Sequence, residues 1–303
     1  MNLKFFTLSL LLAAVVYSAS SQTIVYVNKN ATGIPIDGTT WSRAYRDLGQ
    51  ALTASTTISG NVQIWVAAGV YYPTTTTNRS ISFQISRANL TVSGGFAGTE
   101  TNFSQRNFAA NEVVLSGNIG STGTNADNSL QVVQVNNAAV NATTYLTGLR
   151  ISDANSTTTG GGLVVSAGFL SISDCKFSDN NTSEHGAGLF LGGLQGLSNQ
   201  NIIDRCVFYD NYANRYGGGA MISVGRSAKF TNCLFYNNDF STTIIFNITV
   251  INFIYYYIMG TVIIICINII NINIFIFYLP KIQKLKFKFL SRKKDYILCT
   301  NHF

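Results

Sequence analysis

The sequence predicts an all-β fold, a right-handed parallel β-helix, for residues 22–240. Charged residues make up only 11% of the chain, whereas glycine occurs 26 times, and this composition favours a β-rich extracellular protein. Similar segments recur along the second half of the region, and no segment between Leu52 and Phe240 shows helical periodicity. A stack of repeated short strands accounts for all three observations.

The repeat is clearest in three windows that align without a gap, Leu146–Val165, Ile172–Leu191 and Ile203–Ile222, and a fourth window begins at Phe230. Two apolar columns lie two residues apart, as on the buried face of a strand. Their members are Leu149, Cys175, Cys206 and Cys233 in the first, and Ile151, Phe177, Phe208 and Phe235 in the second. We expect each column to form a ladder of like side chains in the core.

Polar residues and glycines follow each apolar pair. The polar columns are Asp153, Asp179, Asp210 and Asn237, and then Ala154, Asn180, Asn211 and Asn238. The glycine columns are Gly160, Gly186 and Gly217, and then Gly162, Gly188 and Gly219. Asp and Asn satisfy backbone groups at turns, and glycine permits sharp bends. One unit cannot bury a core alone, but copies stacked about 4.8 Å apart can.

One amphipathic helix is predicted over Trp41–Leu52, ending by residue 53, because Tyr45, Leu48 and Leu52 recur at helical spacing. Thr39 or Thr40 is the expected N-cap. The other expected elements are short strands bounded by turn residues, at Thr23–Val27, Val62–Tyr72, Ile81–Ile85, Leu90–Val92, Val113–Leu115 and Leu130–Val135.

Residues 1–21 read as a signal peptide, since Lys4 precedes a short apolar run from Phe5 to Val16 and small residues follow. Cleavage near Gln22 would make the protein secreted or cell-surface located. The alternative for this segment is a buried N-terminal strand.

Residues 241–303 differ in character from the repeats, because they are rich in Ile, Asn, Phe, Tyr and Lys and contain a single glycine, Gly260. One hypothesis is read-through or a frameshift into A/T-rich DNA. The other is a membrane anchor: residues 242–280 carry no charge and are long enough to span a bilayer, with a Lys-rich segment after them. Under either hypothesis the tail is not part of the solenoid.

The repeat resembles that of polymorphic outer-membrane proteins. Its F-x-x-N half matches Phe177–Asn180, Phe208–Asn211 and Phe235–Asn238, and its G-G-A half matches Gly218–Ala220. The N-terminal part is similar to surface β-helix proteins of the pectate-lyase-like superfamily, through Gln50–Leu52, Ile64–Tyr71 and Gly94–Glu100. The resemblance implies a helix that caps the first coil, and a fold shared by lyases, hydrolases, adhesins and inert stalks.

Asp153, Asp179 and Asp210 are the candidate metal ligands, since carboxylates on successive rungs could hold Ca²⁺. The resemblance points the same way, because lyases of the superfamily use Ca²⁺ and a basic residue. We favour a turn role, since Asn237 shares the column and Asp and Asn serve turn geometry. No cofactor is therefore expected.

No catalytic residues are assigned, because the reactive side chains do not converge in the alignment. Arg150 and Lys176 share one outward column that ends in Val207. Other expected neighbours are Asp174 with Arg205 and Glu184 with Arg215, while His185 is read as an isolated loop residue. The three aligned cysteines are expected as buried thiols, with a disulfide left open. Trp41 and Trp65 are expected to pack the cap and first coil.

The net charge of +7 does not indicate nucleic-acid binding, because seven basic residues between Lys281 and Lys294, against Asp295, supply +6 of it. The sequence favours a secreted or surface module with an adhesive or structural role, whose partner is a polysaccharide or a cell-surface ligand. The alternative is a polysaccharide lyase or glycoside hydrolase that acts on an acidic polysaccharide. A membrane is a partner only if residues 242–280 are genuine.

Overall fold

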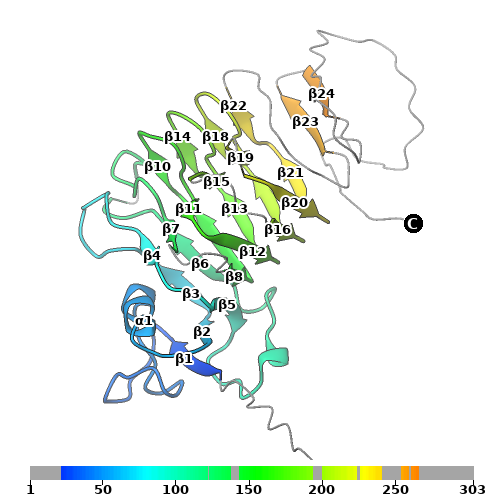
Figure 1. The fold of residues 1–303 in the computed structure, drawn as a ribbon. Coiled ribbons are helices and arrows are strands. Elements are labelled where there is room, and N and C mark those ends of the chain that lie inside the picture. The colour runs from blue at the N-terminus through cyan, green and yellow to red at the C-terminus, as the bar shows by residue number, and fades with distance from the viewer. Residues whose placement is uncertain are drawn as a thin grey trace, which may run out of the picture.

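The computed structural model describes residues 22–121, 123–137, 143–193, 200–223, 226–240, 254–258 and 261–265. The predicted signal peptide and most of the predicted tail lie outside these residues. The described part contains one α-helix and four sheets in which every pair of neighbouring strands is parallel, together with one antiparallel hairpin. The all-β prediction is therefore confirmed, and the four sheets are consistent with a parallel β-solenoid (Figure 1).

Strands of successive repeats lie side by side in each sheet, so that the strands of one sheet come from different repeats. The seven-stranded sheet contains β1 (Thr23–Val27), β2 (Val62–Ala67), β5 (Leu90–Phe96), β8 (Thr143–Thr147), β12 (Phe169–Ser173), β16 (Asn201–Asp204) and β20 (Ala228–Thr231). The six-stranded sheet contains β3 (Gly69–Tyr71), β6 (Val113–Ser116), β9 (Leu149–Ser152), β13 (Lys176–Ser178), β17 (Val207–Tyr209) and β21 (Leu234–Tyr236).

Two further sheets complete the repeats. The five-stranded sheet contains β4 (Phe83–Ile85), β7 (Val133–Asn136), β11 (Leu163–Ala167), β15 (Leu189–Leu191) and β19 (Ala220–Ile222). The four-stranded sheet contains β10 (Asn155–Ser156), β14 (Asn181–Thr182), β18 (Tyr212–Ala213) and β22 (Asp239–Phe240). From the predicted tail, β23 (Ile254–Ile258) and β24 (Thr261–Ile265) form a separate antiparallel hairpin.

The strand register follows the alignment of the sequence repeats. Leu146 pairs with Ile172, which pairs in turn with Ile203. At the other end of the aligned windows, Val165 pairs with Leu191 and Leu191 with Ile222. Because side chains alternate between the two faces of a strand, this register places like residues directly above one another.

The inward Phe column forms a continuous stack in the core. The rings of Phe177 and Phe208 lie 4.7 Å apart with an interplanar angle of 5°. The rings of Phe208 and Phe235 lie 4.5 Å apart at the same angle. Leu149 and the three aligned cysteines are buried beside this stack.

The aligned asparagines form a hydrogen-bonded ladder behind the Phe stack. The Asn180 Nδ2 group donates to the main-chain oxygen of Ile151 at 3.0 Å, and its Oδ1 accepts from the main-chain N–H of Ala154 at 3.1 Å. Asn211 repeats the pattern one repeat later, by donating to the Phe177 oxygen at 2.9 Å and accepting from Asn180. These side chains thus supply hydrogen-bond partners to buried backbone groups at the corner that follows each strand of the six-stranded sheet.

The N-terminal helix is shorter than predicted and begins later. α1 spans Leu48–Ser55, and its N-cap is Asp47, whose side chain accepts from the Gln50 N–H. Tyr45 cannot join the helix because its N–H donates to the Tyr26 oxygen and its oxygen accepts from the Asn28 N–H, which extends the chain along β1. The predicted helical start at Trp41 and the predicted caps Thr39 and Thr40 are therefore wrong, since pairing with β1 outweighs helical spacing. α1 packs against β1, β2 and β4 at the blue end of the stack (Figure 1).

Two strand predictions also change. The predicted strand Val62–Tyr72 divides between two sheets at Ala68, which lies between β2 and β3. The predicted strand Leu90–Val92 continues to Phe96 and pairs there with Ala67.

Aromatic side chains cover the outer face of β2 and β5. The Trp65 ring stacks on Phe96 at 4.6 Å, and the Trp41 ring lies 4.7 Å from Tyr26. The Trp41 Nε1 group donates to the main-chain oxygen of Glu100 at 2.8 Å. Both tryptophans thus lie in the packing around the first repeats.

Glu100 fixes the loop that follows β5. Its carboxylate accepts the backbone N–H groups of Ala97, Gly98 and Thr99 at 2.6, 3.0 and 3.0 Å. Burial raises the pKa of this carboxyl, but hydrogen bonds from the backbone outweigh burial and lower it below the ordinary 4.5.

We expect Glu100 to make the stability of the protein depend on acid. Because the folded-state pKa is lowered, the stabilisation is complete above 4.5 and is lost as the pH falls through the folded-state pKa. Thermal unfolding should be measured at a series of pH values from above 4.5 downward. The midpoint temperature should fall more steeply with falling pH in the natural protein than in Glu100→Gln. Parallel pH curves for the two proteins would contradict this role.

Replacing Phe208 with alanine should open a cavity between its two stacked neighbours and cost about 3–5 kcal/mol. The control is Tyr212→Ala, because Tyr212 is 39% exposed, and it should change stability by only about 0.5 kcal/mol. Urea unfolding followed by circular dichroism measures both. Equal unfolding midpoints for the two variants would argue against the stacked core.

Candidate functional site

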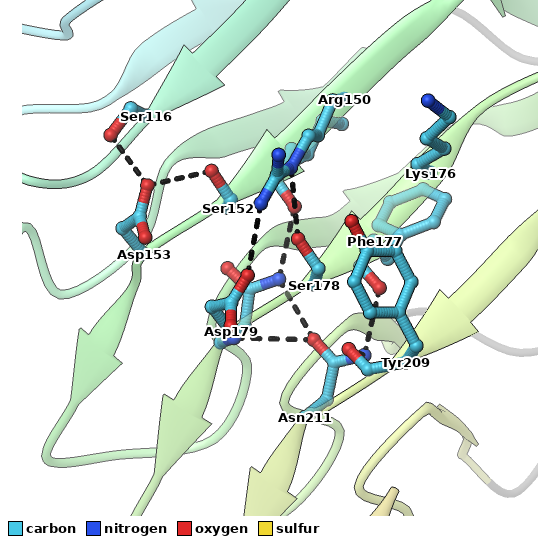
Figure 2. Close-up of polar contacts among 12 residues, drawn as sticks. Ser116, Arg150, Ser152, Asp153, Lys176, Phe177, Ser178, Asp179, Tyr209 and Asn211 are labelled. Carbon is cyan, nitrogen blue, oxygen red and sulfur yellow. Dashed lines mark hydrogen bonds and ion pairs between the residues drawn. The ribbon is translucent and has the colours of Figure 1, made fainter. Parts of the chain in front are cut away.

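The outward face of the six-stranded sheet carries a group of polar contacts that joins several repeats (Figure 2). In one column Val114 pairs with Arg150, Arg150 with Lys176, and Lys176 with Val207. The next column points the same way and contains Ser116, Ser152, Ser178, Tyr209 and Tyr236, of which the three serines are buried. We call these two columns, with Glu112 and the adjoining column Asp153, Asp179 and Asp210, the polar face.

Arg150 is held by side chains of the next two repeats. Its Nη2 lies 3.1 Å from Asp179 Oδ2, and its Nε donates to Ser178 Oγ at 3.0 Å. Its guanidinium carbon lies 5.9 Å from the centre of the Tyr209 ring. Burial lowers the pKa of Arg150, but Tyr209, Asp179 and Glu112 outweigh burial and raise it, so this cation is permanent.

Lys176 makes the second ion pair of the face. Its Nζ lies 2.8 Å from Glu112 Oε1, and the two side chains are 49% and 41% exposed. An exposed pair of this kind contributes roughly 0–1 kcal/mol. The two basic residues of the outward column therefore each have an acidic partner from another strand or loop.

The three aspartates occupy a corner with unusual backbone geometry. Asp153, Asp179 and Asp210 have φ values of 66°, 58° and 53°, and Asn237 has 51°. This left-handed region is one that Asp and Asn adopt more readily than most residues. Asp153 also accepts hydrogen bonds from Ser116 Oγ at 2.7 Å and Ser152 Oγ at 2.6 Å (Figure 2). These contacts fit the turn interpretation of the column.

A metal centre would need several ligands that converge. The described residues contain no group of three or more His, Cys, Asp or Glu side chains that could hold a metal ion. Asp153 is engaged by serines and Asp179 by Arg150, so their carboxylates are directed to different partners.

The remaining candidate residues lie at other corners. Cys175, Cys206 and Cys233 are buried free thiols, and burial raises the pKa of Cys206. Arg205 pairs with Asp174 through Nε at 2.7 Å and Nη2 at 2.9 Å. The contacts between Arg205 and Asp174 link neighbouring repeats.

The prediction that His185 is an isolated loop residue is wrong. Its ring stacks on Tyr216 of the next repeat at 4.6 Å, and its Nε2 lies 3.8 Å from Glu184 Oε2. The same Glu184 oxygen lies 3.2 Å from Arg215 Nε, which is the expected ion pair. Burial lowers the pKa of His185, and Arg215 adds to this effect while Glu184 opposes it. The alignment column that joins His185 to Tyr216 is the signal that could have predicted the stack.

Sequence reasoning missed two parts of the polar face. The contact between Lys176 and Glu112 joins residues 64 positions apart, and Glu112 precedes the aligned windows. The contact between Arg150 and Asp179 could have been predicted, because the alignment places these two residues close together in successive repeats.

Comparisons with family models, curated proteins and solved structures gave no match for this chain. In the part of the chain that the structure describes, no helix is both long and apolar enough to cross a membrane.

The turn role of the corner aspartates is tested at Asp210. Asp210→Gly should leave stability nearly unchanged, because glycine adopts a positive φ freely, whereas Asp210→Ala should cost about 1–2 kcal/mol. Thermal unfolding with Ca²⁺ and with a chelator measures both variants and the natural protein. A Ca²⁺-dependent rise in stability that both variants lose would favour a metal role instead.

Proposed function

We propose that this chain is a secreted or cell-surface, right-handed parallel β-helix that serves as an adhesive or structural module. The right-handed winding is supported by the strong preference of parallel strand crossovers for that hand. The repeat pattern supports a place among pectate-lyase-like β-helix proteins with F-x-x-N and G-G-A repeats. The Phe and Asn columns of this pattern are the stacked rings and the hydrogen-bonded ladder.

One observation carries the proposed role: both cations of the polar face are paired with carboxylates. Arg150 binds Asp179 and Lys176 binds Glu112, while Asp153 accepts from two serines. Acid–base cleavage of a polysaccharide needs two placed carboxylates, or a carboxylate, metal and base together. Side chains that neutralise one another across repeats instead stabilise a regular surface, as a scaffold requires.

The alternative is a polysaccharide lyase or glycoside hydrolase. The polar face favours it to the extent that Arg150 lies beside Asp179, as Figure 2 shows, and Lys176 lies beside Glu112. Under this alternative, an acidic polysaccharide would displace Asp179 and Glu112 from the two cations.

Incubation of the full chain with polygalacturonate, alginate and hyaluronan, with and without Ca²⁺, distinguishes the two functions. Ultraviolet absorbance detects the unsaturated product of a lyase, and a reducing-end assay detects hydrolysis. We expect no product in either assay. Turnover that is abolished in Asp179→Asn but kept in Asp210→Asn would establish an enzyme and overturn the scaffold role.

A further inference from the structure

A groove with a volume of about 630 Å³ lies between α1 and β4, and its lining includes no residue of the polar face. Its size is within the range of small-ligand sites. One wall comes from α1 and the residues before it, and the other from β4 and the residues before it. The lining residues that carry the argument are Tyr45, Gln50, Thr53, Ile81, Ser82 and Gln84.

More of the groove lining is apolar than polar, and its polar part is supplied mainly by uncharged groups that form hydrogen bonds. Gln50 and Gln84 supply amides, and Tyr45 supplies a hydroxyl. The Thr53 hydroxyl donates to the Gly49 oxygen at 2.9 Å and so offers an acceptor, and Ser82 Oγ accepts from Gln84 and so offers a donor. Among the lining residues the single charged one is Asp47, and its Oδ1 accepts from the Gln50 N–H at 2.9 Å as the N-cap of α1. The lining therefore offers no cation to an acidic ligand.

Gln84 is held in position before any ligand arrives. Its Nε2 donates to Ser82 Oγ at 2.6 Å and to Gln134 Oε1 at 3.2 Å. With its N–H groups directed along the sheet, the amide offers its oxygen as an acceptor. A side chain fixed in this way loses little conformational entropy on binding.

Apolar surface lies beside these polar groups. Ile81 is 37% exposed, and Pro73, Ala54 and the ring of Tyr45 also line the groove. A ligand that suits this lining has apolar C–H faces and many hydroxyls, and carries no charge. A pyranose ring has these properties.

We propose that the groove between α1 and β4 binds a neutral saccharide chain. This inference rests on the proposed role as a non-catalytic module and names the chemistry of one partner. A uronate or sulfated chain is disfavoured, because recognition of an anion calls for Arg or Lys, and Asp47 would repel it.

The test is calorimetric titration of the full chain with cellohexaose, mannohexaose, maltohexaose and hexagalacturonic acid. We expect binding of at least one neutral hexasaccharide, unchanged by added salt, because no ionic contact is involved. The double variant Gln50→Ala/Gln84→Ala should weaken that binding by about tenfold or more. The matched control Asn181→Ala removes an amide from β14, outside the groove, and should bind as the natural protein does.

Three results would overturn the inference: no binding of any neutral hexasaccharide, equal affinity in the natural protein and the double variant, or tighter binding of hexagalacturonic acid. Circular dichroism of each variant checks that the fold is intact. These outcomes leave the scaffold role untouched, whereas shortened or unsaturated products in the titration mixtures would overturn that role.

Discussion

In-register stacking of parallel strands is the constraint on which the structure depends. It places Phe208 over Phe177 and Asn211 over Asn180, so that each repeat completes the hydrogen bonds of the one before it. The Phe stack excludes water from the corner, and the Asn ladder supplies partners to the main-chain groups that are then buried. The Phe stack depends on the Asn ladder, because without the ladder the water-free corner would contain buried backbone groups that lack hydrogen-bond partners.

The same register determines what the surface offers. Outward residues of neighbouring repeats also lie side by side, so their charges meet as Arg150 with Asp179 and Arg205 with Asp174. These pairs use the groups that an acid–base site would need, and the resulting surface is regular. The N-terminal end differs, since α1 and β4 leave a groove lined by amides, hydroxyls and apolar side chains.

The sequence was most informative where the repeat is most regular. The alignment of Leu146–Val165 with the later windows matches the strand register that the structure shows. The helix start was mispredicted, because Tyr45 has helical spacing to Leu48 yet hydrogen bonds to β1 across a long loop. The Lys176–Glu112 pair and the groove at Gln84 could not be predicted in this way. Glu112 and Gln84 both precede the aligned windows, so the alignment contains no information on what they contact.

A double-mutant cycle between Asn180 and Asn211 tests the central claim most directly. Both side chains are buried, and Asn180 Nδ2 donates to Asn211 Oδ1 at 2.9 Å. If the repeats stack as described, Asn180→Ala and Asn211→Ala should be non-additive, with a coupling of about 1 kcal/mol or more in urea unfolding. Additive effects within about 0.5 kcal/mol would mean that the two asparagines do not touch, and would contradict the stacked repeat.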